Sequence, residues 1–142
     1  MPPVRDHRFD ELTTGELHDI LRLRVDVFVV EQDCAYAELD GRDRESTTRH
    51  IWIADEAGVV AYLRLLDDGE SRRIGRVVTR AAARGTGLAG RLVDHAILTS
   101  DAPWVLDAQT RLEPWYRDRG FETAGSEFVE DGIPHVPMRR GS

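Results

Sequence analysis

The chain has 142 residues, of which 41% are hydrophobic and 32% charged, a composition typical of a single globular domain over residues 1–142. Its net charge of −7 argues against general binding to nucleic acids or acidic membranes, and no apolar run approaches the ~20 residues that a membrane span requires. A single cysteine excludes an internal disulfide, and the first residues lack the apolar run of a secretory signal, so we expect a cytoplasmic protein.

Positive charge is concentrated in one stretch of the chain. Six of the 19 basic residues lie between Arg72 and Arg91, where there is no acidic residue. The rest of the chain therefore carries 13 arginines against 26 acidic residues. An island of arginines indicates an anion-binding site when it coincides with a second signal for anions, and a glycine-rich turn inside the island supplies one.

The N-terminal third predicts a strand, a helix and a long polar segment. We expect the strand from Arg8 to Leu12. Thr13 and Glu16 have the spacing of a capping box, in which each side chain binds the backbone amide of the other. Apolar residues at helical spacing predict that the helix runs to about Val30. The segment from Glu31 to Thr48 is rich in acidic residues and predicts a loop or a broken helix, and segments of that length are usually functional.

Three antiparallel strands are predicted in the middle of the chain. His50–Ala54 and Val59–Leu66 flank a turn at Asp55–Gly58, which predicts a hairpin. The third strand is Ile74–Thr79. A glycine-rich turn and an amphipathic helix follow, and the helix is predicted to end near Ser100.

The last third predicts one parallel strand, a short helix and a hairpin. Trp104–Ala108 is expected to run parallel to the preceding strand because a helix crosses over between them. Pro114–Arg119 predicts a helical turn, and Phe121–Phe128 and His135–Arg139 predict a hairpin around Glu130–Gly132. The fold class is therefore α+β, with a mixed, mostly antiparallel sheet and helices on both faces. The exposed edge strands of the hairpin are a candidate surface for a homodimer.

The glycine-rich turn is typical of phosphate binding. Glycines let the backbone approach a ligand closely, and the first amides of the following helix have no partner in the helix. Gly85–Gly90 matches the G-x-G-x-x-G pattern of dinucleotide sites, with Asp107 where a ribose-binding acid would follow. However, Arg80–Ala83 separates the turn from its strand, and too few residues follow Asp107 to build a nucleotide-binding half. These two features disfavour the dinucleotide interpretation.

A second interpretation begins one residue earlier. Arg84-x-x-Gly87-x-Ala89 resembles the R/Q-x-x-G-x-G/A signature of the GNAT N-acetyltransferase superfamily. The order of elements is similar to that of this family, with Val77–Thr79 in the place of its fourth strand, which splays from the fifth. Trp115–Phe121 resembles its Y-x-x-x-G-F segment. Three further stretches resemble the ElaA-like branch of the superfamily: Phe28–Cys34, Arg49–Ile51 and Glu130–His135.

This resemblance implies that acetyl-CoA is the cosubstrate and lies between the diverging fourth and fifth strands. Backbone groups of Val77, Val78 and Thr79 would hold the pantetheine arm. Arg80 and Arg84 are expected to help bind phosphate because a guanidinium fork suits phosphate oxygens. The pyrophosphate itself would be held at Arg84 and by the backbone amides of the turn, which are those of Gly85, Thr86, Gly87, Leu88, Ala89 and Gly90.

The resemblance also implies an acyltransferase that moves the acetyl group directly to an amine in a ternary complex. Tyr116 matches the general-acid position of the family, and a tyrosine with a pKa of ~10 stays protonated at pH 7. We prefer Glu31 as the general base because it ends the first helix, near the place where acceptors approach in this fold. The full set of candidates for the base is Glu31, Glu38, Asp40, His50 and His135.

The acidic residues from Glu31 to Glu45 predict a cationic acceptor, either a small amine or a peptide N-terminus. Two alternatives to direct acetyl transfer remain. A non-catalytic CoA-binding or regulatory module would keep the glycine turn and lose turnover, and Cys34 beside a histidine would form a covalent acyl-enzyme. An arginine-based nucleic-acid binder is disfavoured by the net charge. The histidines and Cys34 lack the spacing of metal ligands, so we predict no metal.

Overall fold

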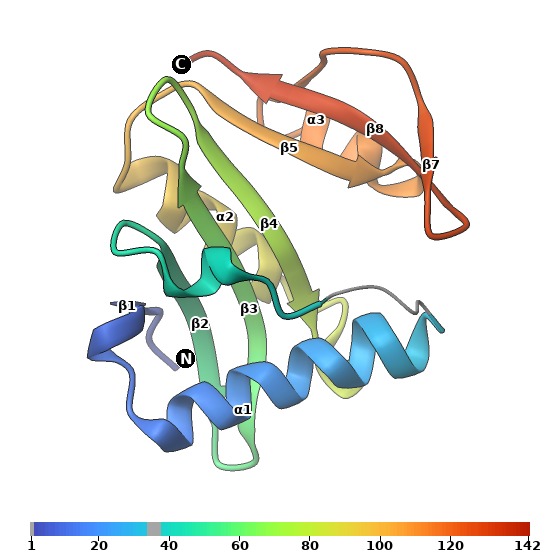
Figure 1. Cartoon of the computed structure of the whole chain (residues 1–142). Coiled ribbons are helices and arrows are strands. Elements are labelled where there is room, and N and C mark those ends of the chain that lie inside the picture. Colours follow the sequence, from blue (N-terminus) through green and yellow to red (C-terminus); the bar gives the residue numbers. More distant parts are fainter. Residues whose placement is uncertain (1, 34–37) are drawn as a thin grey trace.

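The structure, a computed structural model, describes residues 2–33 and 38–142. Within these residues, eight strands form one sheet, with the order β1-β2-β3-β4-β5-β8-β6 and with β7 paired to β8 (Figure 1). All neighbouring strands are antiparallel except β4 and β5. The strands are β1 (Arg5–Arg8), β2 (Arg49–Asp55), β3 (Gly58–Asp67), β4 (Arg72–Thr79), β5 (Trp104–Gln109), β6 (Glu122–Thr123), β7 (Phe128–Glu130) and β8 (Ile133–Arg140).

Three α-helices and five short helical segments connect the strands in the described part of the chain. None of these helices has both the length and the apolar character needed to cross a membrane. The α-helices are α1 (Thr14–Arg24), α2 (Leu88–Leu98) and α3 (Glu113–Arg117), and the short segments are η1 (Phe9–Glu11), η2 (Val25–Glu31), η3 (Gly41–Arg44), η4 (Ala81–Ala83) and η5 (Thr110–Leu112).

The first helix begins at the predicted capping box. The Thr13 hydroxyl accepts a hydrogen bond from the Glu16 amide at 3.0 Å, and the Glu16 carboxylate accepts one from the Thr13 amide at 2.9 Å. α1 then continues without a break into η2, a wider π-helical segment whose last bond runs from the Gln32 amide to the Val27 carbonyl. The predicted end near Val30 is therefore confirmed, and the wider turns carry the helix to Glu31.

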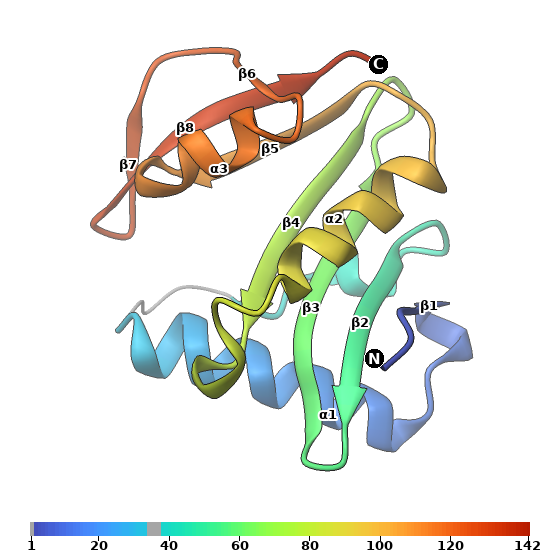
Figure 2. The ribbon, with the colours of Figure 1, turned by 180° about the vertical axis from the view of Figure 1, so that it is seen from behind.

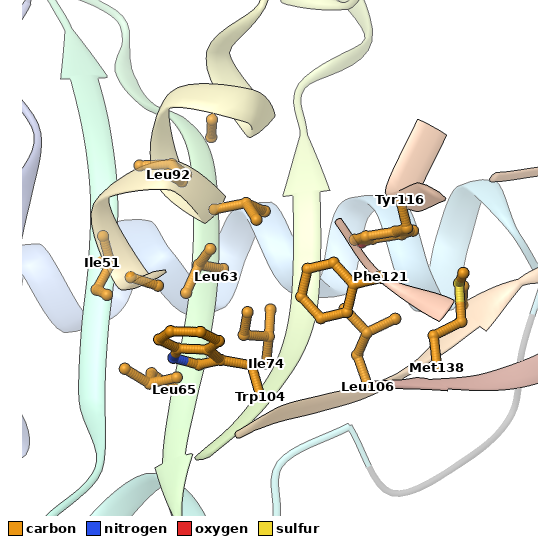
Figure 3. Close-up of a cluster of buried hydrophobic side chains, with 14 of the residues drawn as sticks. Ile51, Leu63, Leu65, Ile74, Leu92, Trp104, Leu106, Tyr116, Phe121 and Met138 are labelled. Atoms are coloured by element: carbon orange, nitrogen blue, oxygen red, sulfur yellow. The ribbon is translucent and has the colours of Figure 1, made fainter. Parts of the chain in front are cut away.

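The two faces of the sheet carry separate hydrophobic clusters because neighbouring side chains in a strand point to opposite faces. On one face α1 and η2 bury Ile20 and Phe28 against Trp52 and Tyr62. On the other face lie α2 and α3, seen in front of the sheet in Figure 2. The predicted arrangement with helices on both faces is confirmed. Figure 3 shows the core under α2 and α3, which includes Ile51, Leu63, Leu65, Ile74, Leu92, Trp104, Leu106, Tyr116, Phe121 and Met138.

The sheet is split between β4 and β5. The two strands pair only where Arg72 meets Trp104 and Arg73 meets Val105, at the start of each strand. Beyond this point they diverge, and β5 pairs along its whole length with β8 instead (Figure 1). This is the splay between the fourth and fifth strands that the sequence predicted.

Two predicted strands differ in position from the observed ones. The first strand lies at Arg5–Arg8 and not at Arg8–Leu12, because the Glu11 carboxylate binds the Arg8 amide and closes the turn η1. The first arm of the terminal hairpin is interrupted between β6 and β7. Opposite this break β8 contains Pro137, which has no amide hydrogen to donate to a neighbouring strand.

Candidate functional site

A cleft of about 580 Å³ lies where β4 and β5 separate. Its walls are formed by the glycine-rich turn, the free edge of β4, the end of η2, α3 and the β7–β8 hairpin. Segments far apart in the sequence therefore meet in one concave site, as expected for a ligand-binding cleft.

The glycine-rich turn forms the entrance to α2. Gly85 and Gly87 have φ of +78° and +82°, a region in which any other residue would be strained. Gly87 is the N-cap, so the amides of Leu88–Gly90 lie in the first turn of the helix, where no acceptor within the helix is available. All of these residues line the cleft. Thr86 does not line it, and its hydroxyl instead donates to the Ala83 carbonyl at 2.6 Å, which holds the turn closed.

The free edge of β4 forms the next part of the wall. The strand contains a bulge, in which Arg76 and Val77 together lie opposite Leu63 of β3, and Arg76 has the unusual φ of +53°. Val77 of the bulge lines the cleft, as do Val78 and Thr79, which follow it. Because β5 pairs only with the first two residues of β4, this edge of the strand has backbone groups that face the cleft and no neighbouring strand.

Arg84 closes one side of the cleft together with Glu31. Its guanidinium donates to the two carboxylate oxygens of Glu31 at 2.7 and 2.8 Å, and its Nε donates to the Thr79 carbonyl at 3.0 Å. The hydrogen bonds from Arg84 lower the pKa of the Glu31 carboxyl below its ordinary value. A carboxylate held in the ionised form is a weak proton acceptor, so this geometry weighs against Glu31 as the general base. Arg80 does not line the cleft and pairs with Asp55 at 3.2 Å.

Tyr116 lies on the opposite wall, in α3. Its side chain is 5% exposed, packs edge-on against Trp115 and Phe121, and lines the cleft. Burial raises the pKa of Tyr116 to about 12, because the charged phenolate is poorly solvated there. The phenol therefore holds its proton throughout the neutral range, as a general acid must before it acts.

Arg119 is a cleft residue that the sequence analysis did not identify. Its guanidinium lies over the Trp115 ring, 4.4 Å from its centroid, and donates to Asp94 of α2 at 2.6 Å. A Cβ atom at Gly90 would clash with Nη2 of this guanidinium, so a larger residue there would require the Arg119 side chain to move. The only signal in the sequence was the position of Arg119 directly before Gly120 in the Tyr116 motif.

Comparison with known proteins identifies the family. Residues 16–141 match the sequence profile described as an Acetyltransferase (GNAT) domain. The chain belongs to the GNAT acetyltransferase family. A UPF0039 protein of Mycobacterium tuberculosis is 47% identical over 92% of this chain and 87% of its own length. Protein ElaA of Escherichia coli is 40% identical over 96% of this chain and 94% of its own.

The solved structures agree with this assignment. The crystal structure of an acyl-CoA N-acyltransferase from Pseudomonas aeruginosa matches with a TM-score of 0.93 and 40% identity, covering 99% of this chain and 100% of that one. The predicted GNAT membership and the likeness to ElaA are confirmed. The GNAT fold is one that binds acyl-CoA and supports acyl transfer.

The acidic segment that follows residue 37 is not open to a ligand in this GNAT domain. It crosses the same face of the sheet as α1 (Figure 1), where its carboxylates meet arginines from α1, β3 and β4. Three arginines balance three carboxylates, so the cluster has no net charge to attract a cationic acceptor. This buried charge network, in which only Asp40 and Arg76 are partly exposed, joins Arg24 to Glu38 at 2.6 Å, Arg24 to Asp43 at 2.8 Å, Arg64 to Asp40 at 2.7 Å and Arg76 to Glu38 at 3.0 Å.

The structure also separates the other candidates for the base. Glu38 and Asp40 belong to the buried charge network. His50 is 1% exposed, lies outside the cleft wall and is held between the Tyr62 hydroxyl and the Asp43 carbonyl, and burial lowers its pKa. His135 does line the cleft. Cys34, the candidate nucleophile, lies outside the described residues.

Proposed function

We propose that this GNAT domain transfers an acetyl group from acetyl-CoA to a primary amine, by direct attack within a ternary complex. One observation carries the proposal: the amides of the glycine-rich turn, the free edge of β4 and the buried Tyr116 phenol line the same cleft. The first two features suit the phosphates and the extended arm of a CoA thioester. The third supplies the proton that a departing thiolate needs.

The CoA moiety would lie along the wall formed by β4 and the glycine-rich turn. The pantetheine arm would pair with backbone groups of Val77, Val78 and Thr79 along the free edge of β4, like an additional strand, although the Thr79 carbonyl already accepts a hydrogen bond from Arg84. The pyrophosphate would accept hydrogen bonds from the amides between Gly85 and Gly90, where the helix dipole favours negative charge. Arg84 would add a guanidinium fork once Glu31 gives way.

The chemistry requires two proton transfers. An alkylammonium with a pKa of ~10.4 must lose a proton before it attacks, which at neutral pH costs about 4–5 kcal/mol. The thiolate of CoA must gain one as the C–S bond breaks. Tyr116 would donate that proton, since its phenol stays protonated well above neutral pH.

The acceptor would be a small amine or a peptide N-terminus. Support for a cationic acceptor comes from the β7–β8 turn, where Glu130 and Asp131 line the mouth of the cleft and are exposed. Carboxylates at that position favour the approach of an ammonium group.

The test measures CoA binding by calorimetry and the release of CoA thiol from acetyl-CoA with a panel of amines and peptide N-termini. We expect Tyr116→Phe to lower kcat by about 10²- to 10⁴-fold while CoA affinity is unchanged, because the phenylalanine keeps the packing and removes only the proton donor. Undiminished turnover would remove Tyr116 from the mechanism. A wild-type protein that binds CoA and acetylates no amine would instead be a CoA-binding module.

A further inference from the structure

His135 lies on the wall of the cleft, on the face of the sheet that α1 covers. Its neighbours in β8, Val136 and Met138, are buried in the core on the opposite face. Because side chains alternate along a strand, the imidazole of His135 points away from that core. The cross-strand partner of His135 supports this direction, since the side chain of Gln109 on β5 reaches Gln32, next to the end of η2, at 3.4 Å.

The imidazole ring is held in one orientation. Its Nδ1 lies 2.8 Å from the Ile133 carbonyl oxygen, which can only accept a hydrogen bond. Nδ1 therefore carries the hydrogen, and in the neutral ring the free electron pair is on Nε2. The ring also stacks on Phe128, with 5.7 Å between the centroids and 19° between the planes. A fixed ring with a free Nε2 has the form that a general base requires.

The other titratable groups on the cleft wall are less suited to take a proton near neutral pH. A carboxylate has an ordinary pKa of ~4 and an imidazole one of ~6.5, so the imidazole holds an abstracted proton more strongly. Glu31 and Asp107 are paired with Arg84 and Arg73, the second pair at 3.4 Å. Among the described residues, the charged groups on the elements around His135 are Asp107 on β5, Arg111 on η5, Glu130 on β7 and Asp131 in the turn.

We propose that His135 is the general base of this acetyltransferase and takes a proton from the acceptor ammonium through Nε2. This inference rests on the proposed function. His135 and Tyr116 extend from opposite faces of the split sheet. Tyr116 belongs to the hydrophobic core under α2 and α3, and the imidazole of His135 points away from that core. The base would therefore meet the amine on the α1 side, and the acid would meet the thiolate on the α3 side.

The proton transfers balance. The imidazole takes one proton, so that R–NH₃⁺ becomes R–NH₂, and the amine nitrogen forms a bond to the thioester carbonyl carbon. The C–S bond breaks with its electron pair on sulfur, and the thiolate takes the phenolic proton of Tyr116. The second amine proton returns to the Tyr116 phenolate through solvent, and His135 releases its proton to solvent. The products are the amide, CoA thiol and one proton.

The experiment compares His135→Gln with a matched control, His18→Gln, in the full-length protein. His18 lies in α1 with a side chain that is 73% exposed, away from the cleft. Each variant is assayed with the best alkylamine from the panel and with a matched arylamine, which is already unprotonated at neutral pH. CoA affinity and thermal stability are measured in parallel.

We expect His135→Gln to lower kcat/KM for the alkylamine by about 10²- to 10⁴-fold. The arylamine should be affected far less because it needs no base for its first deprotonation. CoA affinity should not change, and His18→Gln should match the wild type. Equal losses with both amines, or no loss with either, would overturn the assignment of His135 as the base. The proposed function would then still be tested separately, by the effect of Tyr116→Phe on kcat. Absence of turnover with any amine in the wild type would overturn both.

Discussion

Two regions of the molecule are rich in charge of one sign: the acidic segment after residue 37 and the arginine-rich stretch that contains the glycine-rich turn. Internal ion pairs occupy the charged groups of the first, whereas the second also presents backbone amides. The acidic segment is closed, because its carboxylates are neutralised by Arg24, Arg64 and Arg76 in the buried charge network. The glycine-rich turn stays open, because its binding groups are backbone amides at the start of α2. A run of charged side chains in a sequence therefore marks a ligand site only where the fold leaves those side chains without internal partners.

Most arginines between Arg72 and Arg91 also have internal partners. Arg73, Arg76, Arg80 and Arg84 each form an ion pair with a carboxylate of this chain. Long side chains can rotate to find an opposite charge, whereas the first amides of a helix are fixed in direction and have no acceptor in the helix. What the island offers a phosphate group is thus mainly the backbone between Gly85 and Gly90, with Arg84 at its border.

The largest effect is expected from opening the closed region. Arg24→Ala should lower the free energy of unfolding by about 3–5 kcal/mol, because Glu38 and Asp43 each contact two arginines and the variant removes the more deeply buried one from both. Chemical denaturation measures this. The matched control is Arg42→Ala, whose pairs with Glu45 and Asp68 are partly solvated and should contribute less than ~1 kcal/mol. Equal losses in the two variants would contradict the distinction between the regions.

Closing the open region should abolish ligand binding and leave the fold intact. Gly87→Glu places a carboxylate at the proposed pyrophosphate site, and we expect CoA affinity measured by calorimetry to fall by at least about 100-fold, or ~2.8 kcal/mol. The matched control is Gly69→Glu, in the β3–β4 turn, because its φ of +84° is close to the +82° of Gly87. Both variants carry the same backbone strain. Unchanged CoA affinity in Gly87→Glu would refute this site.

The smallest effect concerns the ion pair at the border of the open region. Glu31→Gln removes the carboxylate that occupies the Arg84 fork, so CoA should bind more tightly, by up to about fivefold, since an exposed ion pair is only weakly stabilising. Turnover should not fall if His135 is the base, as proposed. Glu45→Gln, outside the cleft, serves as the control. A large loss of kcat in Glu31→Gln would return Glu31 to the role of general base.

Most of the fold was predictable because its signals are local. The capping box of α1, the β2–β3 hairpin and the amphipathic α2 all depend on residues within one or two turns of each other. The two shifted strands depend on distant partners. β1 ends where the Glu11 side chain closes a turn, and β6 is cut short opposite Pro137, which approaches it only in the folded sheet.

The candidate site was predictable in part for the same reason. The glycine-rich turn and Tyr116 are both carried by short motifs, and the structure brings both to the cleft. The Tyr116 motif includes Arg119 but gave no role to it, because its guanidinium meets Gly90 only in the folded protein. The sequence favoured Glu31 as the base only from its place at the end of the first helix, because the sequence does not show which carboxylates pair with an arginine or which way the side chain of His135 points.

The sequence by itself determined the order of elements and the turn at Gly85–Gly90, because helix starts, strand alternation and turn glycines are properties of neighbouring residues. Its resemblance to the GNAT family implied the splayed sheet. Only the tertiary structure decided which charges are available. Arg24 and Glu38 are 14 residues apart, and Arg84 and Glu31 are 53 apart. The free energy of an ion pair depends on distance and burial in the folded protein, and neither is encoded in local spacing.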